Sequence, residues 1–465
     1  MHQCYPQNLR FVPTRLLDVG DEDQAVIRLS SESNGQTTPI KYMALSHQWG
    51  PPGQHRKFCT YKSNIEELKK NISIAALPRT FQDAVHITRS LGVRYLWVDS
   101  LCIIQNDPCD WERESKFMEQ VFSSAYCTLA ASCARGVDDS FLKAPPARHG
   151  VTLVNPHSSS LYYLYESIDD FHNHVDQGEL NMRGWVLQER ALSRRTIYFT
   201  ETQSYWECGG GVRCETLTKS KNRKASFLGD SNFPHSVDAY VKGMKIELYQ
   251  DLYERYSKLA LSFSADRPVA IRGLESRLSQ TFRTAGGYGV FELYLHRCLL
   301  WQRTGDRVKR IGEFHGMRVP SWSWMAYDGG IRYMDVPYGG VSWREDIVSP
   351  FAKAKKLDRS NETVMEGSEG TIGLEIEAPA YDLLEPHSEK ILLDEPGRKL
   401  PRFLKCVIVG EDKSPTRGDS RVCYVLIIVF FAFVDGVEVW ERVGVGALVR
   451  RHIILDGVQT KVHIQ

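Results

Sequence analysis

The residue best placed for chemistry in this sequence is Glu114, which falls within an apolar helical stripe. Trp111 lies three residues before it and Met118 four residues after it, so the three side chains share one face of a helix. A carboxylate on a face turned toward the core must find partners or lose its charge. Burial raises the pKa of such a group and suits it to proton transfer or to holding a ribose or a cationic intermediate. The alternative is a structural ion pair between Glu114 and an arginine.

A second set of polar side chains interrupts another apolar stripe. Four residues recur at helical spacing on one face: Trp185, Gln188, Glu189 and Leu192. Two polar groups inside such a stripe predict a buried network or the wall of a binding site, and Arg183 lies beside them. The alternative is a structural bridge from Glu189 to Arg183 or Arg190 that docks the helix.

Asp99, Cys102 and Gln105 follow a predicted strand at residues 94–99. In open parallel sheets, ligands bind outside the carboxyl ends of the strands. Asp99 could therefore hold a sugar hydroxyl, or it could fix its own loop by hydrogen bonding. Cys102 could be a nucleophile if its thiol pKa were lowered. Its apolar neighbours also fit a small core residue.

Ser46 and Trp49 lie at the end of another predicted buried strand, residues 42–46. The Ser46 hydroxyl could bind phosphate or cap the following loop, and the Trp49 ring could stack on a planar base. Packing of Trp49 beneath the loop is the alternative.

The elements that must position these residues alternate between the two types. The spacing predicts strands at 42–46, 94–99 and 126–131, and helices at 78–91 and 107–125. Asp107 and Pro108 supply an N-cap residue followed by Pro at the first helical position. Strand, helix, strand, helix, strand with short links predicts a parallel α/β sheet. A short helix at 185–192 and strands at 196–199 and 204–207 follow, after an irregular insertion at 145–180.

We predict five regions along the chain of 465 residues. They are an N-terminal extension (1–39), an α/β domain (40–214), an exposed linker (215–244), a helical region (245–330) and a β-rich region (331–465). Within the last region the expected strands are 371–376, 405–409 and 437–443, with a buried strand pair in the apolar run 422–434.

Composition restricts the function classes. Lys plus Arg is 58 and Asp plus Glu is 57, which argues against a nucleic acid or an anionic membrane as a partner. The longest apolar run, 13 residues, is too short for a transmembrane helix. The N-terminus lacks the features of a secretory signal. Eleven cysteines without a CxxC pair predict free thiols, no metal site and a cytoplasmic location.

Three long segments resemble the HET domain of filamentous fungi, and together they cover about residues 40 to 210. They are YMALSHQWG at 42–50, the stretch from LPRTFQDA at 77–84 through LGVRYLWVDSLCIIQ at 91–105, and RGWVLQERALS at 183–193. One departure is His47, where relatives often carry an aromatic residue such as Tyr.

The resemblance implies a role in heterokaryon incompatibility, the programmed death of fused fungal cells that carry unlike alleles. It also implies a distant likeness to TIR domains, some of which cleave NAD, and the pair Trp111 and Glu114 resembles the TIR region that holds a catalytic glutamate. One hypothesis is an enzyme with NAD as substrate, Glu114 or Glu189 as the carboxylate and a nearby tryptophan for stacking.

The second hypothesis is a non-catalytic death module. Such a module would act by self-association as a homo-oligomer or by docking an allelic or NLR-type partner protein. A hydrolase built on Cys102 is the third.

Overall fold

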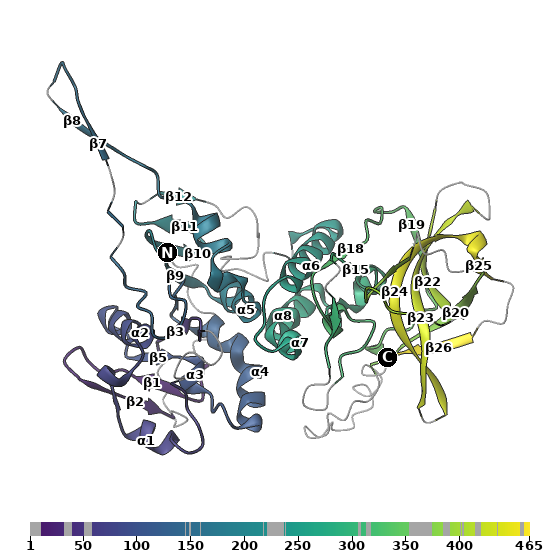
Figure 1. Ribbon diagram of the computed structural model, residues 1–465, viewed down its shortest axis with the longest axis horizontal. Coiled ribbons are helices and arrows are strands. Elements are labelled where there is room, and N and C mark those ends of the chain that lie inside the picture. The colour runs from purple at the N-terminus through teal and green to yellow at the C-terminus, as the bar shows by residue number, and fades with distance from the viewer. Residues whose placement is uncertain are drawn as a thin grey trace. The chain divides into compact units, whose positions relative to one another are not determined.

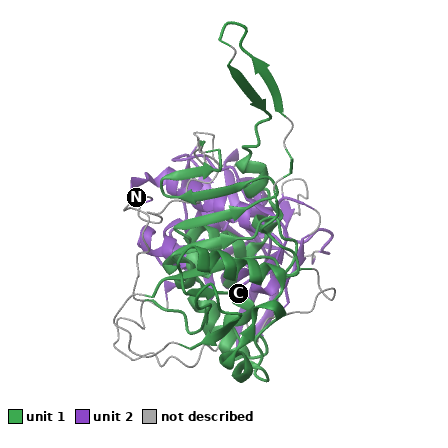
Figure 2. Cartoon of the chain, turned by 90° about the vertical axis from the view of Figure 1, so that its left-hand side faces the viewer, with its two compact units in different colours: residues 1–236, 269–274 green, residues 237–268, 275–465 purple. Residues whose placement is uncertain are grey.

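The structure is a computed structural model. It describes residues 11–31, 40–50, 58–144, 146–147, 150–158, 160–216, 218–220, 237, 239–305, 308–312, 318–352, 374–384, 391–399, 401, 404–413, 420–434, 436–455 and 460–465. The chain forms two compact units, residues 1–236 with 269–274 and residues 237–268 with 275–465 (Figure 2).

The first unit is built on a ten-stranded sheet whose four central strands are parallel (Figure 1). In sheet order these are β9 (Arg195–Phe199), β6 (Cys127–Ala130), β3 (Tyr42–Ser46) and β5 (Tyr95–Trp97). The predicted parallel α/β sheet is therefore confirmed at its centre. Antiparallel strands extend both sides, so the complete sheet is mixed. They are β10 (Ser204–Cys208), β11 (Gly211–Cys214) and β12 (Lys219–Ser220) beyond β9, and β1 (Leu16–Asp18), β2 (Val26–Ser30) and β4 (Ile72–Ser73) beyond β5.

Helices α2 (Arg79–Ser90), α4 (Pro108–Ser124) and α5 (Gly184–Leu192) form where the sequence predicts helices, within one residue at each end. Two further helices, α1 (Ile65–Lys70) and α3 (Asp99–Cys102), were not predicted. The Asp107 carboxylate caps α4 by accepting a hydrogen bond from the Cys109 backbone N–H, and Pro108 occupies the first position. Gly92, at φ 65°, takes the left-handed conformation just after α2.

The N-terminal residues contribute to the sheet, whereas the sequence placed residues 1–39 outside the domain. Leu16 and Leu17 of β1 are 1% and 0% exposed, and β1 pairs with both β2 and β5. A strand of three fully buried residues shows no alternation, which explains why this strand was not predicted.

The predicted irregular insertion at 145–180 is wrong, because it contains regular structure. Strands β7 (Gly150–Val154) and β8 (Leu161–Tyr165) form an antiparallel hairpin, followed by two short helical turns, His172–Asp176 and Glu179–Met182. All ten residues of the two strands are exposed. The burial alternation that usually reveals a strand is therefore missing here.

The second unit begins with helices and continues with strands, but the predicted helical region at 245–330 is helical only in part, because short strands begin within it at Gly286. Its helices are α6 (Lys242–Ser257), α7 (Arg267–Ala270), α8 (Arg272–Phe282) and α9 (Leu295–Cys298), of which α7 and α8 cross the unit boundary. Six short strands follow in pairs: β13 (Gly286–Gly287) with β14 (Val290–Phe291), β15 (Trp301–Arg303) with β18 (Ile331–Tyr333), and β16 (Lys309–Arg310) with β17 (Tyr327–Asp328).

An eight-stranded sheet makes up the rest of the second unit. Its members are β19 (Val341–Trp343), β20 (Ile376–Leu383), β21 (Ile391–Leu393), β22 (Lys405–Asp412), β23 (Val422–Val434), β24 (Val437–Val449), β25 (Ile453–Ile454) and β26 (Thr460–Ile464).

Two strand predictions in this unit need correction. The apolar run 422–434 is one strand of 13 residues that pairs with β24, where the sequence predicted a strand pair. The strand predicted at 371–376 starts at Ile376, and residues 371–373 lie outside the described part. Most of the predicted linker at 215–244, namely 221–236, also lies outside the described residues.

A buried ionic network docks α5 onto the sheet of the first unit. The Arg190 guanidinium donates to Asp176 (2.6 Å) and to both carboxylate oxygens of Glu207 (3.0 and 3.1 Å). The Tyr198 hydroxyl also donates to Glu207. The predicted docking bridge on this helix therefore exists, but its acids are Asp176 and Glu207 instead of Glu189.

Replacing Arg190 with methionine should lower the free energy of unfolding by about 3–5 kcal/mol, because two buried carboxylates lose their cation. Denaturant unfolding of the full chain measures this loss. The control is Arg135→Met, since Arg135 and its partner Glu179 are 75% and 64% exposed and the change should cost less than about 1 kcal/mol. Equal losses for the two variants would contradict the network's importance.

Candidate functional site

The centre of the candidate site is a hydrogen bond between the end of β3 and the last turn of α5. The Ser46 hydroxyl donates to Oε2 of Glu189 at 2.5 Å. Ser46 is buried and Glu189 is half-buried. The two residues are 143 positions apart in the chain, so the sheet and the docked helix must both form before they meet.

Asp99 joins this centre from the adjacent strand, because β3 and β5 are neighbours in the sheet. Its Oδ2 accepts a hydrogen bond from the indole N–H of Trp49 at 2.9 Å, and its Oδ1 accepts one from the Ser100 backbone N–H at 2.6 Å. The Asp99 side chain is still 32% exposed. The carboxylate is thus held in place on one side and open to a ligand on the other.

His47 also belongs to this group. Its Nδ1 lies 3.8 Å from Oδ1 of Asp99, and its ring packs edge-on against Phe81. Burial is the main cause that lowers the pKa of His47, with the positive charge of Arg183 adding to it and the Asp99 charge opposing it. The imidazole is therefore neutral at neutral pH. Its Nε2 is buried with no hydrogen-bond partner among the described residues.

Arg183 closes the group on the side of α5. Its guanidinium donates to the backbone carbonyl of His47 at 2.6 Å. This bond ties the residue before α5 to the loop after β3. The positive charge of Arg183 also acts on the Glu189 carboxyl group.

The Glu189 carboxyl group has an unusual pKa. The pKa of this group is raised from 4.5 to about 7; burial is the largest cause, and the negative charge of Asp99 acts in the same direction. The Ser46 hydrogen bond and the Arg183 charge act in the opposite direction. A carboxyl group that titrates near neutrality can both take up and release a proton at physiological pH.

We call this group of six residues the strand-end cluster: Ser46, His47, Trp49, Asp99, Arg183 and Glu189. Ser46 ends β3, and Asp99 follows β5 after a single residue. The cluster therefore lies at the carboxyl ends of two adjacent parallel strands, where open α/β sheets bind ligands.

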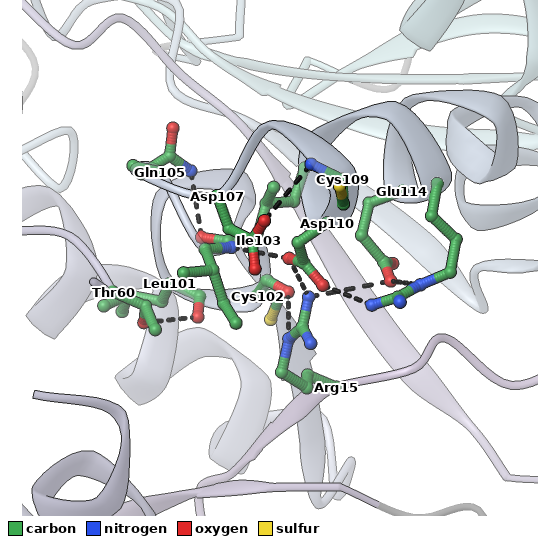
Figure 3. Close-up of polar contacts among 12 residues, drawn as sticks. Arg15, Thr60, Leu101, Cys102, Ile103, Gln105, Asp107, Cys109, Asp110 and Glu114 are labelled. Carbon is green, nitrogen blue, oxygen red and sulfur yellow. Dashed lines mark hydrogen bonds and ion pairs between the residues drawn. The ribbon is translucent and has the colours of Figure 1, made fainter. Parts of the chain in front are cut away.

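Glu114 lies in a different set of contacts, which involves two arginines (Figure 3). Nη2 of Arg15 lies 3.6 Å from the Glu114 carboxylate, and Nε of Arg113 lies 3.2 Å from it. Both arginines also pair with Asp110, at 2.5 Å for Arg15. Glu114 is 4% exposed, so its predicted burial is confirmed. The alternative that Glu114 forms an ion pair with an arginine is also what the structure shows.

This arginine-carboxylate cluster, made of Arg15, Asp110, Arg113 and Glu114, also holds the short helix α3. Nε of Arg15 donates to the Cys102 carbonyl at 2.6 Å, and Asp110 accepts a hydrogen bond from the Ile104 N–H at 2.8 Å. Since α3 begins at Asp99, these bonds fix the segment that carries one of the strand-end carboxylates.

Cys102 is buried in the core, and the Gln105 side chain bonds to the backbone of its own loop. Cys102 is 1% exposed, and burial raises its thiol pKa to about 12. The thiol is therefore protonated at neutral pH, which argues against the nucleophile hypothesis. The Gln105 amide donates to the carbonyls of Asp99 (3.2 Å) and Ile103 (3.0 Å), and so fixes the loop after α3.

The remaining predicted residues lie on α4 and α5. Gln188 is 3% exposed, and its side-chain oxygen accepts hydrogen bonds from the backbone N–H groups of Gly273 and Leu274, within the same compact unit. Trp111 on α4 and Trp185 on α5 are half-buried. Trp49, by contrast, is hydrogen-bonded within the strand-end cluster.

Sequence reasoning missed His47 and Arg15 as members of these two clusters. His47 was set aside because it departs from the pattern of the HET relatives, although its position between Ser46 and Trp49 already placed it at the strand end. Arg15 lies far upstream of the conserved-looking segments, and nothing in the sequence connects it with residues 102–114.

The described residues contain no group of His, Cys, Asp and Glu side chains arranged to hold a metal ion. All ten cysteines in the described part of the chain are free thiols. Within the same residues, no helix has the length and apolar character needed to cross a bilayer.

Residues 42–189 match the family model described as Heterokaryon incompatibility protein (HET). The matched stretch begins with β3 and ends at Glu189, so it contains every residue of the strand-end cluster. The chain therefore carries a HET domain, as its sequence motifs predicted. No significant match appears among curated proteins or among solved structures, so the likeness to TIR domains has no support from these comparisons.

Two variants should move the Glu189 pKa in opposite directions. Ser46→Ala removes a donor that favours the ionised form and should raise the pKa above about 7, and Asp99→Asn removes a like charge and should lower it. Because the folded pKa exceeds the unfolded one, Glu189 makes stability fall as pH rises from 4.5 toward 7. The upper limit of that fall, measured by unfolding at a series of pH values, should shift up in the first variant and down in the second. A shift in the same direction for both would refute this assignment.

Arg15→Met should lower the free energy of unfolding by about 3–5 kcal/mol, because buried Asp110 and Glu114 lose a shared cation. Arg28→Met is the matched control, since Arg28 is 57% exposed and its partner Asp18 keeps Arg94. Its cost should stay below about 1 kcal/mol. Thermal or denaturant unfolding distinguishes the two, and an equally mild effect of Arg15→Met would mean that the arginine-carboxylate cluster is not structural.

Proposed function

We propose that this protein is an effector of heterokaryon incompatibility that acts in the cytoplasm of fungal cells and causes the death of fused cells. We further propose that it acts as an enzyme on the N-glycosidic bond of NAD or a related nucleotide, as some TIR domains do. The strand-end cluster is the proposed active site. The sequence left Glu114 and Glu189 as alternatives for the catalytic carboxylate, and we assign this role to Glu189.

One observation supports this chemistry above the others. Two carboxylates, Asp99 and Glu189, meet beside an indole at the carboxyl ends of parallel strands, and no arginine neutralises Asp99 among the ion pairs of the described residues. Glu114 lacks this quality, because two arginines already pair with it. A ligand with a developing positive charge is favoured by the first environment and disfavoured by the second.

The proposed reaction is hydrolysis. The bond between ribose C1′ and the nicotinamide nitrogen breaks, and its electron pair leaves with nicotinamide. The ribose then carries an oxocarbenium-like positive charge, which an adjacent carboxylate stabilises. Water adds to C1′ and gives up a proton, and ionised Glu189 can accept that proton because its pKa is about 7. The products are ADP-ribose, nicotinamide and a proton.

The other members of the cluster have roles that follow from their chemistry. The Trp49 ring offers a surface for stacking on the nicotinamide or adenine base. Arg183 places a guanidinium beside the site, where it suits a pyrophosphate group. Ser46 orients the Glu189 carboxylate through the 2.5 Å hydrogen bond.

Incubation of the purified full chain with NAD, with nicotinamide release measured by chromatography, tests the proposal. Glu189→Gln should reduce the rate by about 100-fold or more, because it keeps the shape and loses the proton acceptor. Glu112→Gln is the control, since Glu112 is 61% exposed on α4 and should leave the rate unchanged.

Wild-type protein that kills cells but leaves NAD and other nucleotides intact would overturn the enzymatic proposal. The death module would then act without catalysis, through self-association or through an allelic or NLR-type partner. Equal nucleotide cleavage by wild type and Glu189→Gln would instead remove Glu189 from the active site.

A further inference from the structure

The hairpin of β7 and β8 is an exposed apolar arm of the first unit (Figure 1). Its large apolar side chains are between 47% and 62% exposed: Val151, Leu153, Val154, Leu161, Tyr162, Tyr163, Leu164 and Tyr165. Apolar groups occupy both faces, since each of the five cross-strand pairs contains at least one of these side chains. Such an extended apolar surface on a monomer marks an interaction site.

The outer edges of the hairpin are open as well. β7 and β8 form a sheet of two strands, and neither pairs with any other strand of the described residues. Proteins normally protect such edges with proline or with charged side chains, especially lysine. Residues 150–165 contain no Lys, Arg, Asp or Glu. A lone hairpin is also only marginally stable in water, so a further strand would stabilise this one.

We propose that the arm pairs with the same arm of a second copy of this chain, β8 against β8 in antiparallel orientation about Tyr163. Two-fold pairing places Leu161 opposite Tyr165, Tyr162 opposite Leu164, and Tyr163 opposite itself. The central pair is then aromatic with aromatic, a stabilising cross-strand combination, and the flanking pairs bury leucine against tyrosine. The result is a four-stranded sheet in the order β7-β8-β8-β7.

Charge supports a second copy as the occupant. A surface that meets itself about a two-fold axis brings the residues near that axis close to their own copies, so a charge there would face a like charge. The β8 edge has none, and the nearest one, Glu166, falls opposite Ser160 in this register. The inference concerns assembly and does not depend on the proposed active site.

The test is the monomer–dimer equilibrium of the full chain by analytical ultracentrifugation. Wild type should form dimers, and Tyr163→Asp should raise the dissociation constant by about tenfold or more, because two like charges then face each other at the axis. Thr152→Asp is the matched control. It places the same charge on β7, across from Tyr163. Both β8 strands then separate this charge from its copy in the dimer, so the variant should still dimerise.

A mixture of Tyr163→Asp and Tyr163→Lys should restore dimers that neither variant forms alone, which excludes misfolding as the cause of the loss. A wild-type chain that stays monomeric at all concentrations would overturn the proposal. So would dimers that persist in Tyr163→Asp, or a mixture that fails to recover them.

Discussion

The guanidinium of Arg15 joins the elements on which the rest of the HET-domain site depends. It donates to the Cys102 carbonyl at the end of α3 and pairs with Asp110 and lies beside Glu114 on α4. Charges that are this deeply buried require partners, because an unpaired ion in the interior costs several kcal/mol. The arrangement fixes α3, and therefore fixes Asp99 at the start of α3, at the edge of the sheet. A residue near the N-terminus thus determines where a carboxylate of the strand-end cluster lies.

Glu114 and Glu189 illustrate how surroundings decide the role of a side chain. Glu114 lies between two arginines, so its charge is compensated within the protein. Glu189 has a hydroxyl donor and a neighbouring carboxylate, and its pKa is raised to about 7. The second environment leaves a carboxyl group that can exchange a proton near neutral pH. This difference is why the proposed chemistry belongs to Glu189.

Much of the fold could be predicted from the sequence. The central strands and helices alternate in type, and the Asp107-Pro108 cap and Gly92 mark clear boundaries. The strands that the sequence missed in the first unit share one physical cause, the absence of a burial pattern. β1 is buried throughout and β7 and β8 are exposed throughout, so none of them shows the alternation by which a strand is recognised.

The site could be predicted only in part, because side-chain partners from distant segments are not encoded locally. The sequence selected Ser46, Trp49, Asp99, Arg183 and Glu189 as candidates, and the structure brings these five residues together. It could not show that Glu114 would meet Arg15, 99 positions upstream, or that His47 would lie buried beside Asp99. A helical face predicts that a residue points inward, but it does not predict what the residue meets there.

We propose that the Glu189 carboxyl group, at the carboxyl ends of the parallel strands, exchanges its proton near neutral pH. A carbon-13 NMR titration of side-chain carboxyl groups in the full chain, with Glu189→Gln used to assign the signal, tests it directly. We expect the Glu189 carboxyl group to titrate with a midpoint near pH 7. A midpoint close to the ordinary value of 4.5 would contradict it.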